Sequence, residues 1–115
     1  MRKENQIRIN AVCETMWNLA MNEYENQCSW YDCVRLKSCK AWVYETEHYY
    51  ILRSYNTFVA VICKGSDLLI DMLRGVYGYT ATSSQHISKF SKGSACGGYS
   101  TAPWGCKERY VYREV

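Results

Sequence analysis

The chain of 115 residues has no apolar run that approaches the ~20 residues of a membrane-spanning helix. Near its beginning it also lacks the apolar core of an export signal, because Arg2 and Lys3 are followed directly by polar residues. We therefore expect no membrane association and a cytosolic location. In that reducing compartment an odd count of seven cysteines indicates free thiols and not a disulfide framework.

Acidic side chains are missing from a long part of the chain, because no Asp or Glu lies between Met72 and Lys107. Residues 1–63 are electrically neutral, so residues 64–115 carry the whole net charge of +3. A net positive chain cannot imitate DNA, which requires a densely acidic surface. The acid-free segment predicts a partner-binding surface of basic and aromatic side chains, namely Arg74, Tyr77, Tyr79, Lys89 and Lys92.

A recognisable catalytic constellation is missing as well. Cys63 and His86 could serve as a nucleophile and a base, but no third residue that would orient the base is evident. Cys63 also belongs to a predicted buried strand. We therefore predict that the protein is not an enzyme and has no small-molecule substrate.

Aromatic side chains are abundant, with eleven Tyr and four Trp. Such side chains bury a large apolar area, carry a polar group and are enriched at contact surfaces, although core packing accounts for most of them. An apolar fraction of 48% and the chain length predict one globular domain over residues 1–115.

A single apolar stripe predicts an amphipathic helix over residues 6–25. Its members recur at helical spacing and are Ile9, Val12, Cys13, Met16, Trp17, Ala20 and Tyr24. Docking of this stripe on the protein's own sheet is favoured over recruitment of a partner helix.

An antiparallel meander is predicted to follow, after a turn and extended chain in residues 27–40. The predicted strands span residues 41–44, 49–55 and 58–63. The last of these is apolar at six consecutive positions, which favours a central strand covered on both faces. Asn56 and Thr57 predict the turn before it, because Asn tolerates the left-handed backbone.

A pair of helices is predicted next. Ser66 and Asp67 indicate the start of a helix that Gly75 and Gly78 end. The residues Thr82 and Gln85 stand three apart and predict a capping box for a second helix over residues 83–91.

The remaining chain completes a predicted α+β fold. Residues 93–105 hold the single Pro and several Gly, which predicts a loop. Residues 107–115 alternate well enough to predict a C-terminal strand that joins the edge of the sheet.

Three stretches resemble a known family: YYILRSYNTFVAVI at 49–62, VYGYTATSSQHISKF at 76–90 and the terminal YREV. The family consists of small proteins, with no assigned reaction, of Gram-positive (Firmicutes) gut bacteria, their phages and their plasmids. Its recurring features are a YxLxSYNTxVA hairpin and a YGYTATSxQHIxKF helix pair. The resemblance implies a mobile-element setting, in which small proteins include anti-CRISPR proteins that bind a CRISPR effector nuclease.

The cysteine-rich segment between Cys28 and Cys39 departs from that family pattern. Cys28, Cys33 and Cys39 are close enough in sequence for three thiolates to bind one structural Zn²⁺, with Cys13, His48 or another Cys as fourth ligand. Unligated core thiols are the favoured interpretation, because free Cys is among the most buried residue types. Two further cysteines, Cys96 and Cys106, flank the glycine-rich loop and could clip it through a metal.

His86 lies near the start of the second predicted helix, beside Ser83, Ser84 and Gln85. A helix start with free N–H groups, hydroxyls and an imidazole can bind an anion, including a nucleic-acid phosphate. Capping of the helix by these residues is the favoured interpretation.

Together with the phage or mobile-element setting that the resemblance implies, these observations predict a non-enzymatic binding protein that inhibits a host defence protein through protein–protein contact. Its most concrete form is an anti-CRISPR inhibitor of a type II CRISPR effector nuclease. The alternative is a small nucleic-acid-binding regulator, since basic and aromatic side chains provide phosphate contacts and base stacking. A helix-turn-helix is disfavoured, because the link from Gly75 to Thr82 exceeds the usual ~3–4 residues.

Overall fold

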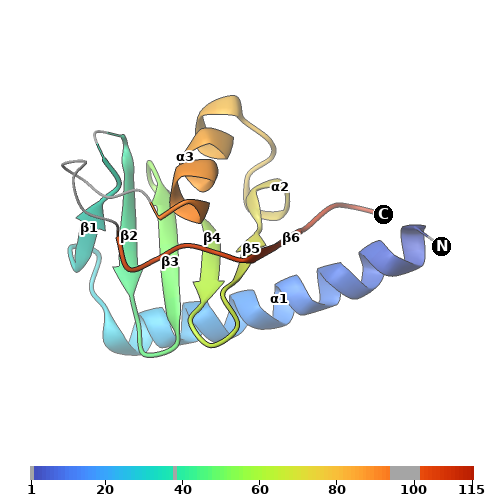
Figure 1. Ribbon diagram of the computed structural model, residues 1–115, viewed down its shortest axis with the longest axis horizontal. Helices are drawn as coiled ribbons and strands as arrows, with labels where there is room; N and C mark the ends of the chain where they lie inside the picture. The colour runs from blue at the N-terminus through green and yellow to red at the C-terminus, as the bar shows by residue number, and fades with distance from the viewer. Residues whose placement is uncertain (1, 38, 94–101) are drawn as a thin grey trace.

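The computed structural model describes residues 2–37, 39–93 and 102–115 and places a six-stranded sheet between helices (Figure 1). The predicted α+β class is confirmed. The helices are α1 (Arg2–Gln27), α2 (Leu73–Val76) and α3 (Ala81–Ser91). The strands are β1 (Cys33–Arg35), β2 (Ala41–Glu45), β3 (Tyr49–Ser54), β4 (Thr57–Cys63), β5 (Leu68–Asp71) and β6 (Glu108–Val111). In these described ranges no helix is long and apolar enough to cross a membrane.

The strands lie side by side in chain order, from β1 at one edge to β6 at the other. Neighbours from β1 to β5 pair antiparallel, and the part from β2 to β4 is the predicted meander. The C-terminal strand joins the sheet as predicted, but β6 runs parallel to β5. A parallel pair needs a crossover connection, and the segment that contains α2 and α3 provides it.

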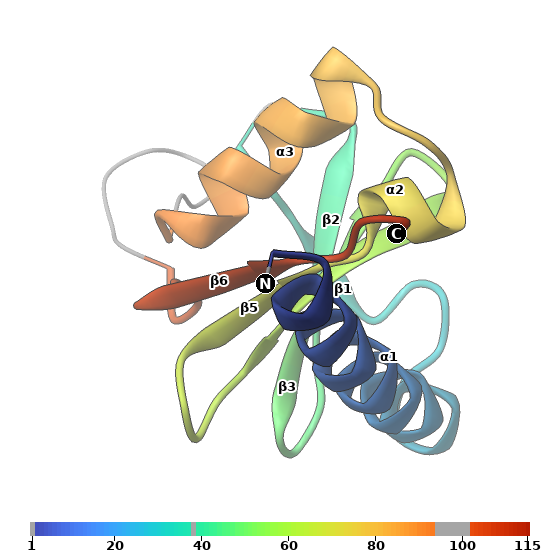
Figure 2. The same cartoon turned by 90° about the vertical axis from the view of Figure 1, so that its right-hand side faces the viewer.

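The two long helices cover opposite faces of the sheet (Figure 2). The predicted stripe of α1 packs against an α1-side cluster of Cys13, Ala20, Tyr44, Tyr49, Ile51, Val61, Ile70 and Met72. An α3-side cluster on the other face includes Leu52, Ala60, Ile62, Leu69, Ile87, Phe90 and Trp104. β4 supplies side chains to both clusters, which confirms that it is a central strand covered on both faces.

The prediction of a helix that begins at Ser66 and Asp67 is wrong. Asp67 lies in a tight turn with a left-handed φ of 54°, and Leu68–Asp71 is strand β5. Helix α2 contains only the last four residues of the predicted helix. The short apolar run LLID suits a strand as well as a helix, and pairing with β4 decides between them.

Two details of turns and caps also differ from the prediction. Helix α3 starts at Ala81, and Thr80 caps it by accepting a hydrogen bond from the Ser83 N–H at 3.2 Å, so the predicted capping box is wrong. In the hairpin between β3 and β4, Tyr55 has the left-handed φ of 54°, and not Asn56. Of the predicted loop over residues 93–105, residues 94–101 lie outside the described part, Cys96 among them.

The C-terminal tail is held against α1 by side-chain amides. The Asn10 amide donates to the Arg113 carbonyl, and its oxygen accepts from the Arg113 N–H at 3.1 Å. Gln6, one turn earlier, donates to the Val111 carbonyl at 2.9 Å. These bonds attach the end of β6 and the residues after it to α1.

One charged side chain is buried without a carboxylate contact in the described structure: Arg53, on β3, is 6% exposed. Its guanidinium carbon lies 3.9 Å from the Trp30 ring centre and 4.3 Å from that of Trp42, its partner on β2. Arg53 Nε donates to the Tyr44 hydroxyl at 2.9 Å, and Nη1 donates to the Tyr55 carbonyl at 2.8 Å. The flat guanidinium therefore fills an aromatic cage as a core element.

Candidate functional site

The α2–α3 surface, which we define as Arg74, Val76, Tyr77 and Tyr79, lies where the chain leaves α2 and turns toward α3. Tyr77 is 62% exposed and Tyr79 is 58% exposed. The local chain direction depends on Gly78, which has a φ of 99° and whose N–H donates to the Leu73 carbonyl at 3.0 Å. Large aromatic side chains are thus presented on a short, hydrogen-bonded connection.

This surface carries a positive charge that stacks on an aromatic ring. The Arg74 guanidinium carbon lies 4.9 Å from the Tyr79 ring centre, within the range of a cation–π contact. The nearest carboxylate in the sequence is Asp71, which is partly buried. Burial raises the pKa of Asp71, although a hydrogen bond from the Leu73 N–H and the charges of nearby arginines oppose this. The exposed charge of the surface is therefore basic.

The lysines that were predicted to belong to the same surface lie elsewhere. Lys89 Nζ donates to Cys39 Sγ at 3.0 Å, and Lys92 follows the last turn of α3, next to Trp104 and Lys107. Helix α3 has 11 residues, so its two ends are separated by about 16 Å at 1.5 Å per residue. The structure brings together Arg74 and Tyr79, and leaves Lys92 at the far end of α3.

A buried polar junction joins the two motifs that carry the family resemblance. The Ser54 hydroxyl lies 2.8 Å from His86 Nδ1 and 2.9 Å from the Ser83 hydroxyl. The Tyr55 ring lies 5.8 Å from the His86 ring and is half exposed above it. Burial, with a smaller contribution from the Lys89 charge, lowers the pKa of His86 and keeps the imidazole neutral near pH 7. The junction ties the β3–β4 hairpin to α3.

Anion binding and base catalysis would each require His86 to be accessible from solvent. Ser54, Ser83 and His86 are all buried, and the Ser83 N–H at the helix start is already bonded to Thr80. The proposed nucleophile and base are also separated: Cys63 packs with the α1-side cluster, whereas His86 lies on the α3 face. The geometry gives these residues a packing role, because Thr80 and not one of them caps the helix, and it does not bring Cys63 and His86 together.

The cysteines predicted to bind zinc are divided between the two faces of the sheet. Cys28 and Cys33 pack against the α1-side cluster, and Cys39 packs against the α3-side cluster. Among the described residues no group of three or more His, Cys, Asp or Glu side chains is placed to hold a metal ion. Zinc binding through Cys28, Cys33 and Cys39 stays a prediction from the spacing.

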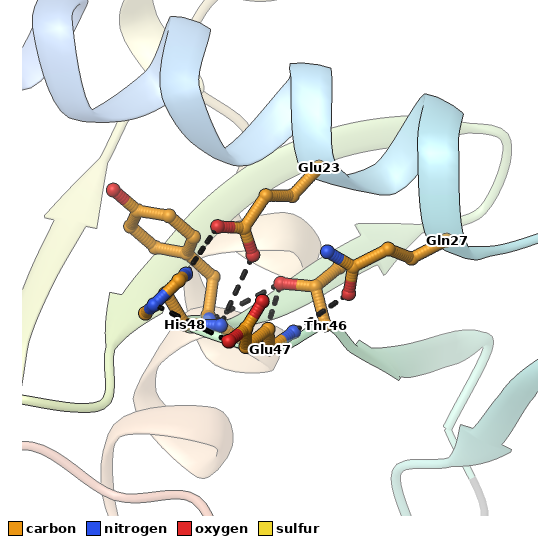
Figure 3. Close-up of polar contacts among 6 residues, drawn as sticks. Glu23, Gln27, Thr46, Glu47 and His48 are labelled. Carbon is orange, nitrogen blue, oxygen red and sulfur yellow. Dashed lines mark hydrogen bonds and ion pairs between the residues drawn. The ribbon is translucent and has the colours of Figure 1, made fainter.

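A second polar contact, absent from the sequence predictions, fastens α1 to the β2–β3 turn (Figure 3). Glu23 accepts from the His48 N–H at 3.0 Å and lies 2.5 Å from His48 Nδ1. One turn later, Gln27 accepts from the Glu47 N–H at 2.8 Å. Burial alone would raise the pKa of Glu23, but hydrogen bonds from Thr46 and His48 outweigh it and lower that pKa.

The Glu23 carboxylate in turn raises the pKa of His48, first by its hydrogen bond and then by its charge. An imidazole held by a carboxylate is the arrangement of a general base. The other ring nitrogen, Nε2, is 3.9 Å from the Glu47 carboxylate, and in the described residues no hydroxyl or thiol is hydrogen-bonded to it. The role that the contacts support is therefore structural: the Glu23–His48 pair holds α1 against the β2–β3 turn.

We expect the Glu23–His48 contact to make stability depend on pH. The folded pKa of His48 lies above 6.5, so its contribution is complete below pH 6.5 and is lost as pH rises through the folded pKa. The folded pKa of Glu23 lies below 4.5, so its contribution is present above pH 4.5 and is lost as pH falls through the folded pKa. The difference in unfolding free energy between the parent and Glu23→Gln should be largest between about pH 4.5 and 6.5, as urea titrations at several pH values can measure.

The two histidines provide an internal control for this prediction. In an NMR titration, His48 should have a pKa above the ordinary value and His86 one below it. Glu23→Gln should return His48 toward about 6.5 and leave His86 unchanged. A stability difference that is constant across the whole pH range would contradict the assigned ion pair.

The fold and these contacts define a small α+β protein with an exposed basic and aromatic surface beside a buried motif junction. The chain belongs to a family of unknown function, DUF8033, whose model matches residues 17–108. This range contains the α2–α3 surface, the Ser54–His86 junction and the Glu23–His48 contact. No curated protein and no solved structure matches the chain.

Proposed function

We propose that this protein is a non-enzymatic binding protein, encoded by a phage or mobile element, that acts in the host cytosol by forming a complex with a host defence protein. The most concrete target is a type II CRISPR effector nuclease, which it would inhibit. The observation that carries the proposal is the α2–α3 surface, which exposes Val76, Tyr77 and Tyr79 together with Arg74. Tyr and Arg, together with Trp, are enriched among the side chains that contribute most binding energy at protein–protein contacts.

The charge of the chain limits how such a complex can form. With a net charge of +3 and a basic exposed surface, the protein is suited to an acidic patch on its partner and not to a site for DNA phosphates. Tyr77 and Tyr79 can bury a large area against the partner at little entropic cost, because each has few rotatable bonds. The complex should thus combine aromatic anchors with a complementary charge.

We expect the double variant Arg74→Glu/Tyr77→Ala to bind the purified effector nuclease at least tenfold more weakly than the parent, a loss of about 1.4 kcal/mol. The change reverses the charge of the surface and removes its most exposed aromatic side chain. Both side chains are exposed, so folding should survive, and calorimetric titration should measure the loss. Inhibition of target-DNA cleavage should fall in parallel.

A matched control is Lys92→Glu/Tyr31→Ala, which makes the same charge change and removes a tyrosine that is 87% exposed. Lys92 lies at the opposite end of α3, and Tyr31 precedes β1. The control should bind and inhibit like the parent. Equal losses in both double variants would mean that overall charge, and not the α2–α3 surface, determines binding.

A second candidate function is nucleic-acid binding by the same surface. The observation that favours it is the stacking of Arg74 on Tyr79, because an arginine and an exposed ring can contact a phosphate and stack on a base. Affinity for a single-stranded oligonucleotide that falls steeply between low and moderate salt, and that the Arg74 variant loses, would replace the first proposal by this one.

A further inference from the structure

The shortest contact between a cysteine and a cation in the described structure joins Cys39 and Lys89. Lys89 Nζ lies 3.0 Å from Cys39 Sγ, although the two residues are 50 positions apart. Cys39 lies between β1 and β2 and packs against the α3-side cluster, and Lys89 extends from α3. Both residues are partly exposed.

Four of the other described thiols are less suited to react with a neighbour. Burial raises the pKa of Cys13 to about 11, and burial also raises the pKa of Cys28 and of Cys106. Cys33 Sγ lies 3.9 Å from the Arg53 guanidinium, which remains protonated and is not a nucleophile. Of the cysteines in the described part of the chain, Cys39 is the one in contact with a lysine amine.

We propose that Cys39 and Lys89 form an oxidative modification site, at which a hydroperoxide oxidises the thiol and the lysine amine then closes a sulfur–nitrogen cross-link. Reactive cysteines lie in electropositive, partly exposed surroundings, and Lys89 places a basic group 3.0 Å from Cys39 Sγ. Sulfenic acids condense with nitrogen to give sulfenamides. The contact distance means that the two atoms can bond with little movement of the backbone.

The reaction has two steps. The Cys39 thiolate attacks one peroxide oxygen, so an S–O bond forms and the O–O bond breaks, and sulfur loses the two electrons that the peroxide gains. The departing hydroxide takes a proton from the Lys89 ammonium and leaves as water, which leaves Lys89 as the neutral amine. Lys89 Nζ, as the neutral amine, then attacks the sulfenic sulfur, so an S–N bond forms and the S–O bond breaks. The departing hydroxide takes a proton from nitrogen and leaves as a second water. One hydrogen peroxide is consumed and the protein loses two hydrogens.

The cross-link would change both charge and flexibility. It neutralises Lys89 and ties the segment before β2 to α3, two parts of the fold that are otherwise joined there by the thiol–amine contact. A thiol reductant would reverse it, because the sulfur of a sulfenamide is open to attack by another thiolate.

The test is peroxide treatment of the full-length protein, followed by digestion without reductant and mass spectrometry. We expect a peptide containing Cys39 joined to one containing Lys89, with a mass about 2 Da below their sum. Dithiothreitol should release the two peptides. Lys89→Arg, which keeps the positive charge, and Cys39→Ser should each lose the linked peptide, whereas Lys92→Arg should keep it.

The result on the parent protein decides the matter, whether or not each variant folds. If peroxide oxidises other thiols and leaves Cys39 reduced, or converts Cys39 to sulfinic acid without any link to Lys89, the proposal is overturned. A Cys39 cross-link to another lysine, still present in Lys89→Arg, would overturn it as well.

Discussion

Replacing Arg53 by lysine is expected to lower the free energy of unfolding by about 3 kcal/mol, although the charge is kept. The guanidinium uses its planar shape between Trp30 and Trp42 and donates at once to Tyr44 and Tyr55. A lysine ammonium cannot reproduce two donors in that plane. It would leave a buried acceptor unpaired and would bury a strongly hydrated charge without a carboxylate.

Urea unfolding followed by tryptophan fluorescence measures this effect, since Trp30 and Trp42 line the cage. Arg109→Lys is a suitable control because Arg109 is exposed on β6, and we expect a change within about 0.5 kcal/mol. Equal stability of the two variants would show that the cage contributes nothing beyond the volume of a long side chain.

A second large effect is expected from Gly93→Ala, which should destabilise the protein by about 2–4 kcal/mol. Gly93 has a φ of 71°, and a Cβ at this position would lie 2.6 Å from the Trp104 carbonyl oxygen. Gly93 also ends α3, since its N–H donates to the Phe90 carbonyl at 3.1 Å. Because the obstructing atom belongs to the backbone, relief requires movement of the chain that carries buried Trp104.

Gly65→Ala is the matched control for that substitution. A Cβ at Gly65 would meet nothing within 4 Å, and its φ is not in the left-handed region. Its melting temperature should remain within a few degrees of the parent, as expected for a change of about 0.5 kcal/mol. Similar melting temperatures for both alanine variants would contradict the close approach of Gly93 to Trp104.

The sequence predicted those parts of the fold that depend on local pattern. The stripe from Ile9 to Tyr24 specifies the buried face of α1 by spacing alone, and the apolar run Phe58–Cys63 specifies a strand with two covered faces. Ser66 and Asp67 predict a helix start before Leu68–Asp71, but this short apolar run also fits a strand, and only the neighbouring strand decides between the two. The parallel pairing of β6 has no local signal at all.

The candidate site, like the fold, is only partly predictable from the sequence. Arg74, Tyr77 and Tyr79 are close in sequence, so composition could locate their surface, but Lys89 and Lys92 depend on how α3 is oriented and packed. The Glu23–His48 contact joins α1 to a turn 25 positions away, which spacing cannot predict. Arg53 does have a signal in the sequence, because it is a charged residue within the apolar stretch YYILRSY of a central strand, with Trp42 opposite.

The bonds between Asn10 and Arg113 have a consequence for a chain that is still being synthesised. Each strand from β1 to β5 pairs with its neighbour in sequence, so these contacts can close as soon as the segments emerge. Asn10 must wait for a partner 103 positions later, and β5 remains an unpaired edge until β6 is made. Until then the nascent chain exposes an unpaired strand edge, a feature that favours premature association between chains.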